Sequence, residues 1–243
     1  MLHGYTQTGN NFRRKLRKLD NGLRRTSTGA KFVYLDGPMT LEIHDIPGIQ
    51  LTTSGYLEGD RHEMGSWFDL RGGSEPPSEL YKLLSLLAAV LKSQGPFDGD
   101  IAFSQGTVVG AIVASLLQGD ARRKAYDSAS QYTGNILRYP DAFLVVQHPP
   151  FKFALFYASQ MGMGTYTDWL YEFPRIETRF CHFFGLLDPM VSHEQRDTVS
   201  VKLGGAKGSR LLYHGGGHFA SMDCASIETA ARFVERCMQV AHE

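Results

Sequence analysis

A short apolar stretch meets an apolar helical pattern at residues 100–110, and a serine stands at the junction. Ile101–Phe103 is typical of a buried strand, and the apolar residues after the serine recur at helical spacing. Only a very tight turn separates the two. Ala102 and Gly106 lie two residues on either side of Ser104, where small residues relieve the crowding of a strained strand-to-helix elbow. The stretch therefore predicts that Ser104 is presented above a sheet as a nucleophile.

Two further residues that a serine nucleophile needs come later in the chain, each just after a predicted strand. Asp188 follows the strand Thr178–Phe184, and His218 follows the strand Arg210–His214 and three glycines. The order Ser, Asp, His is the one that α/β-hydrolases use. A serine hydroxyl attacks only when an imidazole takes its proton, and the imidazole needs a carboxylate to fix its tautomer. We expect Ser104 to be the nucleophile, His218 the base and Asp188 its orienter.

Each of these residues also has an ordinary structural interpretation. Taken alone, a serine at this position more often caps the helix that follows it, an aspartate before proline is usually a turn former, and a histidine after glycines is usually a surface residue. His214 and His148 are the rival histidines, but the first should lie within its strand and the second fits no triad position. The three positional matches together favour the catalytic interpretation.

Strand and helix patterns alternate through the chain, which predicts a mostly parallel sheet with helices on both faces. With 243 residues and 42% hydrophobic content, we expect a single domain spanning 1–243. Lys31–Leu35 is predicted to be a strand, whereas 141–146 fits either a strand or a short helix. Arg122, Arg123 and Lys124 are expected to lie on a solvated surface.

Two irregular inserts, about 40–77 and 159–175, interrupt the alternating pattern. Inserts of this length are usually functional or disordered, so we interpret them as a lid or pocket wall, with surface packing as the alternative. Large apolar residues in them are the candidates for lining a substrate pocket: Trp67, Phe68, Met161, Met163, Tyr166, Trp169 and Tyr171.

Net charge is zero, although the first 31 residues hold eight Lys/Arg and one acid, Asp20. The basic residues lie largely off an apolar stripe formed by Phe12, Leu16, Leu19 and Leu23, so we interpret them as a solvated helix face. We expect neither a nucleic-acid nor a membrane partner, because no recognition motif is present and the longest apolar run is far shorter than the ~20 residues of a membrane span. Three cysteines without paired spacing favour buried thiols and a cytoplasmic location.

Five sequence blocks taken together resemble the fungal serine hydrolase (FSH) family of α/β-hydrolases: Leu2–Gln7 with Asn10, Phe103–Gly106, Pro149–Ala154, Gly185–Val191 and Gly216–His218. The resemblance implies an α/β-hydrolase fold and a Ser-Asp-His esterase or thioesterase without a cofactor or metal. It also implies an acyl ester or thioester substrate, with release of a polyketide or fatty acyl group in secondary metabolism and an acyl-carrier domain as a partner. A non-catalytic family member that keeps the pocket is the alternative.

The first residues bear on the oxyanion hole of such an enzyme. In α/β-hydrolases a His-Gly-x turn supplies one backbone N–H, and the residue after the nucleophile supplies the other. We assign these donors to Tyr5 and Gln105, although an ordinary glycine turn before a helix explains the first segment about as well. The strand that should lead into His3 is almost absent from the sequence, so we expect a truncated first core strand.

Overall fold

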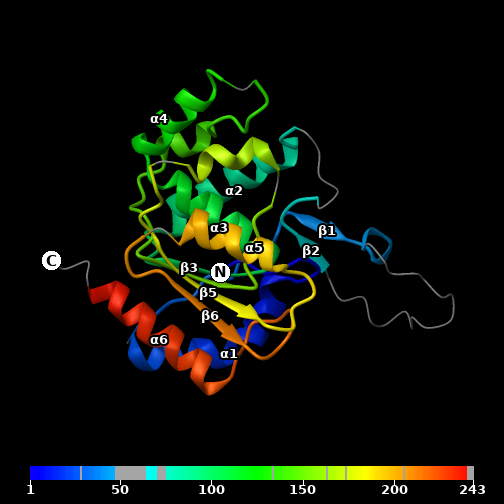
Figure 1. Ribbon diagram of the computed structural model, residues 1–243, viewed down its shortest axis with the longest axis vertical. Helices are drawn as coiled ribbons and strands as arrows, with labels where there is room; N and C mark the ends of the chain where they lie inside the picture. Colours follow the sequence, from blue (N-terminus) through cyan, green and yellow to red (C-terminus); the bar gives the residue numbers. More distant parts are fainter. Residues whose placement is uncertain are drawn as a thin grey trace.

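The computed structural model describes residues 1–27, 29–46, 64–69, 75–132, 134–162, 164–172, 174–204 and 206–239. Its centre is a parallel sheet with the strand order β3-β4-β5-β6 (Figure 1). The strands are β3 (Gly99–Phe103), β4 (Phe153–Tyr157), β5 (Arg179–Gly185) and β6 (Arg210–His214). All neighbours pair in parallel, so every strand ends at the same edge of the sheet. This arrangement agrees with the predicted alternating pattern.

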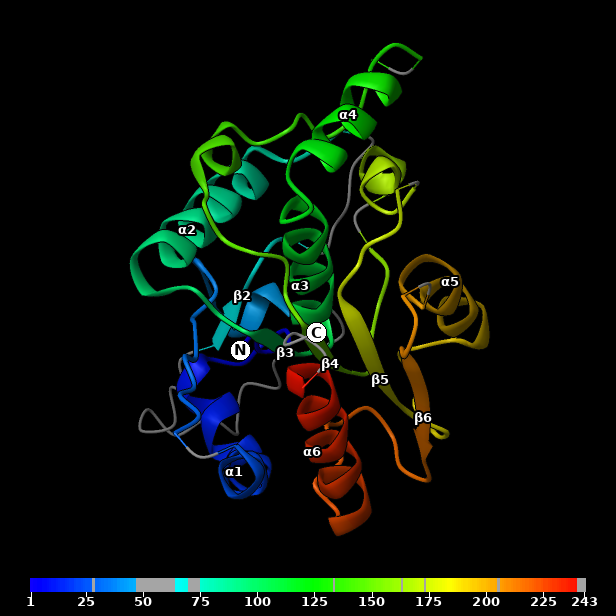
Figure 2. The ribbon, with the colours of Figure 1, turned by 90° about the vertical axis from the view of Figure 1, so that its left-hand side faces the viewer.

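Helices cover both faces of the sheet (Figure 2). On one face α1 (Gly9–Thr26) packs against α6 (Cys224–Gln239), and on the other lie α2 (Ser78–Gln94), α3 (Gln105–Leu116) and α5 (His193–Leu203). The remaining elements are α4 (Asp120–Ala129), the antiparallel strands β1 (Met39–Leu41) and β2 (Met64–Ser66), and three 3₁₀ segments, η1 (Ile43–Asp45), η2 (Asp141–Val145) and η3 (Thr165–Leu170).

Residues 1–3 lie beside β3, in the position that a further parallel strand would occupy. Leu2 bridges in parallel to Leu35 on one side and to Ala102 on the other. Its N–H donates to the carbonyl oxygen of Ile101 at 2.9 Å, and its own carbonyl oxygen accepts from Phe103 N–H at 3.1 Å. Isolated bridges through Leu2 and Leu35 thereby continue the hydrogen bonding beyond β3. This short contact brings the next residues of the chain to the end of β3.

The apolar stripe of α1 is buried as predicted, and it joins one continuous core with the strands and α2. The charges of α1 lie outside this core, since all seven of its Lys and Arg residues are exposed. Thr8 caps the first turn by accepting from Asn11 N–H at 3.2 Å. Burial of an apolar face rather than intrinsic propensity therefore fixes α1 against α6.

The structure corrects three of the sequence-based expectations and decides a fourth that was left open. Lys31–Leu35 is extended but makes a bridge only at Leu35, so it is not a strand. The surface predicted around residue 122 contains α4, and Arg122 is fully buried. The undecided segment 141–145 is a 3₁₀ helix. Cys224 is exposed, unlike the other two cysteines.

Both predicted inserts contribute secondary structure. The first contributes β1, η1 and β2, while residues 47–63 and 70–74 lie outside the described residues. The second contributes η3. Within the described parts of the chain, none of the helices is both long and apolar enough to cross a membrane.

Candidate active site

Ser104 occupies a strained backbone position between β3 and α3. Its φ of 51° and ψ of −120° lie where residues with a Cβ are rarely found. Three hydrogen bonds hold it there: Ser104 N–H donates to Tyr157 O at 2.9 Å, and Ser104 O accepts from the N–H and the hydroxyl of Thr107. This is the predicted elbow, although Ser104 is only 7% exposed and so is less open to solvent than expected.

Two glycines let the first residues of the chain approach this elbow closely. A Cβ on Gly106 would lie 2.4 Å from Leu2 O and 2.6 Å from His3 O. A Cβ on Gly4 would lie 2.6 Å from Cδ1 of Phe103 and 3.3 Å from Cβ of Ser104. Side chains at these positions would push the segments apart. The glycines therefore place the turn Gly4–Gln7 directly beside Ser104.

The structure brings Ser104, His218 and Asp188 together in series. His218 Nε2 is 2.9 Å from Ser104 Oγ, and His218 Nδ1 is 2.8 Å from Asp188 Oδ2. The Asp188 side chain is 1% exposed and that of His218 is 22% exposed. An ionised carboxylate only accepts hydrogen bonds, so this geometry suits a neutral imidazole with its proton on Nδ1 and the lone pair of Nε2 facing the serine hydroxyl. This tautomer is the one in which the imidazole can take a proton from Ser104.

The loops that carry Asp188 and His218 are joined through their main chains. Leu186 N–H donates to His214 O at 2.8 Å, and Leu187 N–H donates to Gly216 O at 3.0 Å. The approach is so close that a Cβ on Gly185 would lie 2.3 Å from Gly217 O. The ring of Phe103 lies 5.1 Å from that of His218 and supports it from the side of β3. These contacts fix the carboxylate and the imidazole relative to each other.

Gln105, the residue after Ser104, anchors the segment that follows β2. Its Oε1 accepts from Trp67 N–H at 3.0 Å, and its Nε2 donates to Phe68 O at 2.8 Å. The hydroxyl of Ser66 also lies within hydrogen-bonding distance of this amide. The side chain of Gln105 thus has a structural role, and its backbone N–H lies at the first position of α3. Tyr5, the other predicted oxyanion donor, lies in the turn beside Ser104.

His3 supports that turn, a role that the sequence analysis missed. Its Nε2 accepts from Gly37 N–H at 2.9 Å, and its Nδ1 donates to Gly4 O at 2.8 Å. The indole N–H of Trp67 donates to His3 O at 2.7 Å. Burial lowers the pKa of His3, which favours the neutral imidazole that these contacts require. The sequence signal for this role is the His3–Gly4 pair, because a neutral histidine next to a glycine turn can donate one hydrogen bond and accept another within the turn region.

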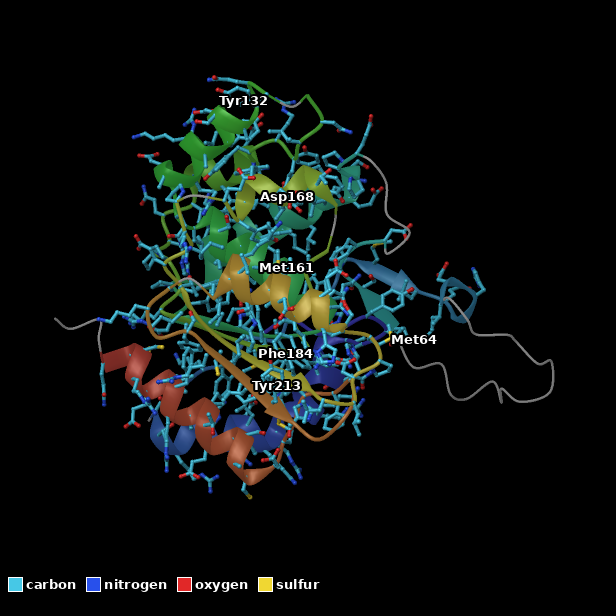
Figure 3. All side chains as sticks on the ribbon, viewed as in Figure 1. Met64, Tyr132, Met161, Asp168, Phe184 and Tyr213 are labelled. Atoms are coloured by element: carbon cyan, nitrogen blue, oxygen red, sulfur yellow. The ribbon has the colours of Figure 1, made fainter. Side chains whose placement is uncertain are left out.

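Four of the seven candidate pocket residues, Trp67, Phe68, Met161 and Trp169, lie in different surroundings, and Tyr166 and Tyr171 are buried. Trp67 is fully buried and Phe68 nearly so, both beside Gln105. Met161 is partly buried and directly follows Gln160, whose N–H donates to the Thr107 hydroxyl at 3.0 Å. Figure 3 shows Met161 below Asp168 and above Phe184 along the vertical axis of the view. Of the four, Met161 is therefore the partly accessible side chain next to the first turn of α3.

Trp169 is not brought beside Ser104. The next residue, Leu170, accepts from the hydroxyl of Ser115, which lies eleven residues after Ser104 and so about 16 Å along the helix. The ring of Trp169 packs against those of Tyr126 and Tyr139 instead. Its place in this aromatic cluster corrects the expectation that it is near the acyl group. Met163 lies outside the described residues.

A second serine–histidine pair lies inside the protein. Ser159 Oγ is 2.7 Å from His182 Nδ1, and both residues are fully buried. The ring of His182 is stacked between those of Phe180 and Phe184, and burial lowers its pKa to about 3. A substrate cannot reach this pair, so its role is structural. Within the described ranges, no group of three or more His, Cys, Asp or Glu side chains could hold a metal ion.

Comparison with known proteins decides the family. A family model described as serine hydrolase (FSH1) matches residues 1–223. The chain belongs to this family. Membership confirms the predicted resemblance and the prediction of a serine hydrolase.

The curated relatives of this serine hydrolase include an uncharacterized hydrolase of Schizosaccharomyces pombe and the esterase OVCA2 of Danio rerio. The first is 27% identical over 96% of this chain, which spans 49% of that relative's length. The second is also 27% identical, over 97% of this chain and 95% of the relative.

Solved structures share the fold of this serine hydrolase. SOBER1 of Arabidopsis thaliana superposes with a TM-score of 0.56 at 13% identity, covering 98% of this chain and 96% of that one. Acyl-protein thioesterase 2 of Zea mays superposes with a TM-score of 0.56 at 14% identity, covering 98% and 91%. At these identities the likeness concerns the fold alone, and it confirms the predicted α/β-hydrolase architecture.

Proposed function

We propose that this chain hydrolyses carboxylic esters or thioesters through an acyl-enzyme on Ser104. The observation that carries the proposal is the series Ser104–His218–Asp188, with distances of 2.9 and 2.8 Å that suit an imidazole whose Nε2 accepts the serine proton. The esterase name of the zebrafish relative supports ester bonds, and the thioesterase name of the maize neighbour supports thioesters.

In the first half-reaction, His218 Nε2 takes the proton of Ser104 Oγ as the oxygen attacks the substrate's carbonyl carbon. The negative charge that forms on the carbonyl oxygen is stabilised by the backbone N–H groups of Tyr5 and Gln105, our proposed oxyanion donors. Protonated His218 then gives its proton to the leaving alcohol or thiol. Asp188 stabilises the imidazolium through Nδ1 in the meantime.

In the second half-reaction, water replaces the leaving group. His218 takes a proton from the water as the water oxygen attacks the ester carbonyl on Ser104, and it returns that proton to Ser104 Oγ as the acid departs. Both half-reactions use the same base, the same oxyanion donors and no redox step. The proposed reaction thus uses three side chains and two backbone N–H groups of this chain.

The surroundings of the site support an apolar acyl group. Leu187 and Met190, in the loop that carries Asp188, are 74% and 61% exposed, and Phe219, directly after His218, is 48% exposed. Together with Met161 they offer apolar surface near the triad, where each buried methylene of an acyl chain contributes ~0.8 kcal/mol. We propose a fatty or polyketide-like acyl thioester or ester, with an acyl-carrier domain as the donor of the thioester.

Labelling with a fluorophosphonate probe tests the proposal, because the probe reacts only with an activated serine. We expect one adduct, found on Ser104 by peptide mass spectrometry and absent from Ser104→Ala. If folded protein acquires no adduct at Ser104, the hydrolase mechanism is excluded and the alternative of a non-catalytic binding protein replaces it.

A further inference from the structure

The loop that carries Asp188 depends on an anchor within the protein. It runs from Gly185 at the end of β5 to Ser192 at the start of α5, and most of its side chains are exposed. Asp188 Oδ1 accepts from Met190 N–H at 2.8 Å and from Val191 N–H at 3.2 Å. The direction of the carboxylate is therefore set by the backbone of this loop.

Arg196 bridges the two ends of the loop. Its Nη2 donates to Gly185 O at 2.9 Å and to Val191 O at 3.0 Å. One nitrogen thus holds the first residue of the loop, Gly185, and the residue before its last, Val191. Because Val191 also donates to Asp188, the guanidinium is linked through a single residue to the carboxylate that holds His218.

The position of Arg196 is itself well determined. It lies in the first turn of α5, where Ser192 and Gln195 form a reciprocal capping box. The residue is 5% exposed, and its guanidinium carbon lies 5.9 Å from the centroid of the Phe184 ring. The anchor is therefore a buried group on a capped helix and not a mobile surface side chain.

Burial of this arginine is costly. Its Nε and Nη1 are buried without a hydrogen-bond partner, and among the described residues no carboxylate forms an ion pair with it. An apolar side chain of similar length would avoid the loss of solvation that a buried cation suffers. Because burying the Arg196 guanidinium costs free energy, its presence here indicates that its hydrogen bonds to Gly185 and Val191 are needed to hold the loop in shape.

We propose that Arg196 is a positioning residue for the hydrolysis, acting through Asp188 and His218 without touching the substrate. The proposal rests on the function proposed above, since it assigns a role to the base and its orienter. When the bridge is lost, the loop ends separate, the carboxylate turns away from Nδ1, and the imidazole no longer holds its accepting tautomer at Ser104.

Arg122 provides a matched control within the same chain. It is also a fully buried arginine that donates to main-chain carbonyl oxygens, those of Trp169, Glu172 and Pro174. It anchors the segment around η3, at the far end of α3 from Ser104. Substitution of either arginine removes a buried cation and its carbonyl contacts, but only one of the two supports Asp188.

The experiment compares Arg196→Met and Arg196→Lys with Arg122→Met and Arg122→Lys. The first readout is kcat and KM for a nitrophenyl ester. We expect Arg196→Met to lose up to about 10²-fold in kcat with KM nearly unchanged, because a small displacement of a catalytic group has an effect of this size. Arg196→Lys, which keeps the charge and can reach one carbonyl, should fall between. The Arg122 variants should keep wild-type kcat.

The second readout is the Nδ1–H proton resonance of His218 by NMR, which reports the contact with Asp188 whether or not the protein turns over substrate. We expect it to shift or broaden in both Arg196 variants and to persist in both Arg122 variants. A folded Arg196→Met or Arg196→Lys with wild-type kcat and an unchanged resonance would overturn the proposal, as would equal losses in the Arg122 series. Failure of Ser104 to react with a fluorophosphonate would count against the hydrolase mechanism, and the resonance would still test the bridge.

Discussion

Gly106 lies so close to Leu2 that a Cβ on the glycine would be 2.4 Å from the leucine's carbonyl oxygen. Because that oxygen belongs to the main chain, no rotamer change can relieve the contact. We expect Gly106→Ala to lower the free energy of unfolding by about 1–3 kcal/mol, the usual cost of overpacking. Urea unfolding measures it, with Gly134→Ala as the control, since a Cβ there meets no atom within 4 Å. Equal stabilities of the two variants would contradict the close approach.

The second prediction concerns the proposed triad. Ser104→Ala and His218→Ala should each lower kcat by about 10⁴-fold or more, and the double variant should be hardly worse, because the two residues act as a unit. Single-turnover kinetics with a nitrophenyl ester measures the losses. Losses that multiply in the double variant would show that the two side chains act independently.

The strain at Ser104 predicts a difference between two inactive variants. At a φ of 51° glycine is unstrained, whereas alanine keeps the crowded Cβ. We expect Ser104→Gly to unfold at a higher urea concentration than Ser104→Ala, by about 1 kcal/mol, even after the greater flexibility of glycine in the unfolded chain. The opposite order of stability would show that the elbow is relaxed.

Buried His182 predicts a pH dependence of stability. Its pKa is lowered to about 3 in the folded protein, against about 6.5 in an unfolded chain. Between these values the unfolded chain binds a proton that the folded protein does not, so stability falls as the pH drops from 6.5 towards 3, by up to about 1.4 kcal/mol per pH unit. Urea unfolding across this range should show a shallower slope for His182→Asn. The same slope in both proteins would show that His182 does not contribute.

The proposed acyl substrate predicts a dependence on chain length. Specificity constants for nitrophenyl esters from acetyl to octanoyl should rise by up to about fourfold per methylene, below micelle-forming concentrations. The rise should shrink in Met190→Ser, and Val201→Ser should leave it unchanged, because Val201 is even more exposed but lies near the C-terminal end of α5. A preference for acetyl would indicate a small-acyl esterase instead.

Much of the fold could be predicted because local signals and global topology agree. The boundaries of α2, β6 and α6 agree with the apolar periodicity of these segments and with the helix-ending or strand-ending residues next to them in the sequence. The series Ser104, Asp188 and His218 could be anticipated because each follows a strand, and parallel strands all end at one edge.

The remaining features depend on distant partners. Arg122 has the sequence surroundings of a surface residue, yet three carbonyl groups about fifty positions later bury it. Trp169 comes after a strand in the sequence, as a pocket residue would, but its ring packs against Tyr126 and Tyr139 at the end of α3 that is far from Ser104. The role of His3 depends on the N–H groups of Gly37 and of the Trp67 indole, and that of Arg196 on main-chain carbonyl oxygens, and the sequence reveals none of these as near. Hydrogen bonds to main-chain oxygens leave no pattern in residue type.

The loops that carry Asp188 and His218 are tied together through backbone atoms, while Leu186, Leu187 and Met190 point outward. Main-chain bonds do not depend on which side chain a position bears. Natural variation can therefore change the rim of the site one residue at a time without disturbing the angle between carboxylate and imidazole. This separation lets one scaffold acquire new acyl preferences through single mutations, and it makes these three positions the natural place to begin directed evolution of the enzyme.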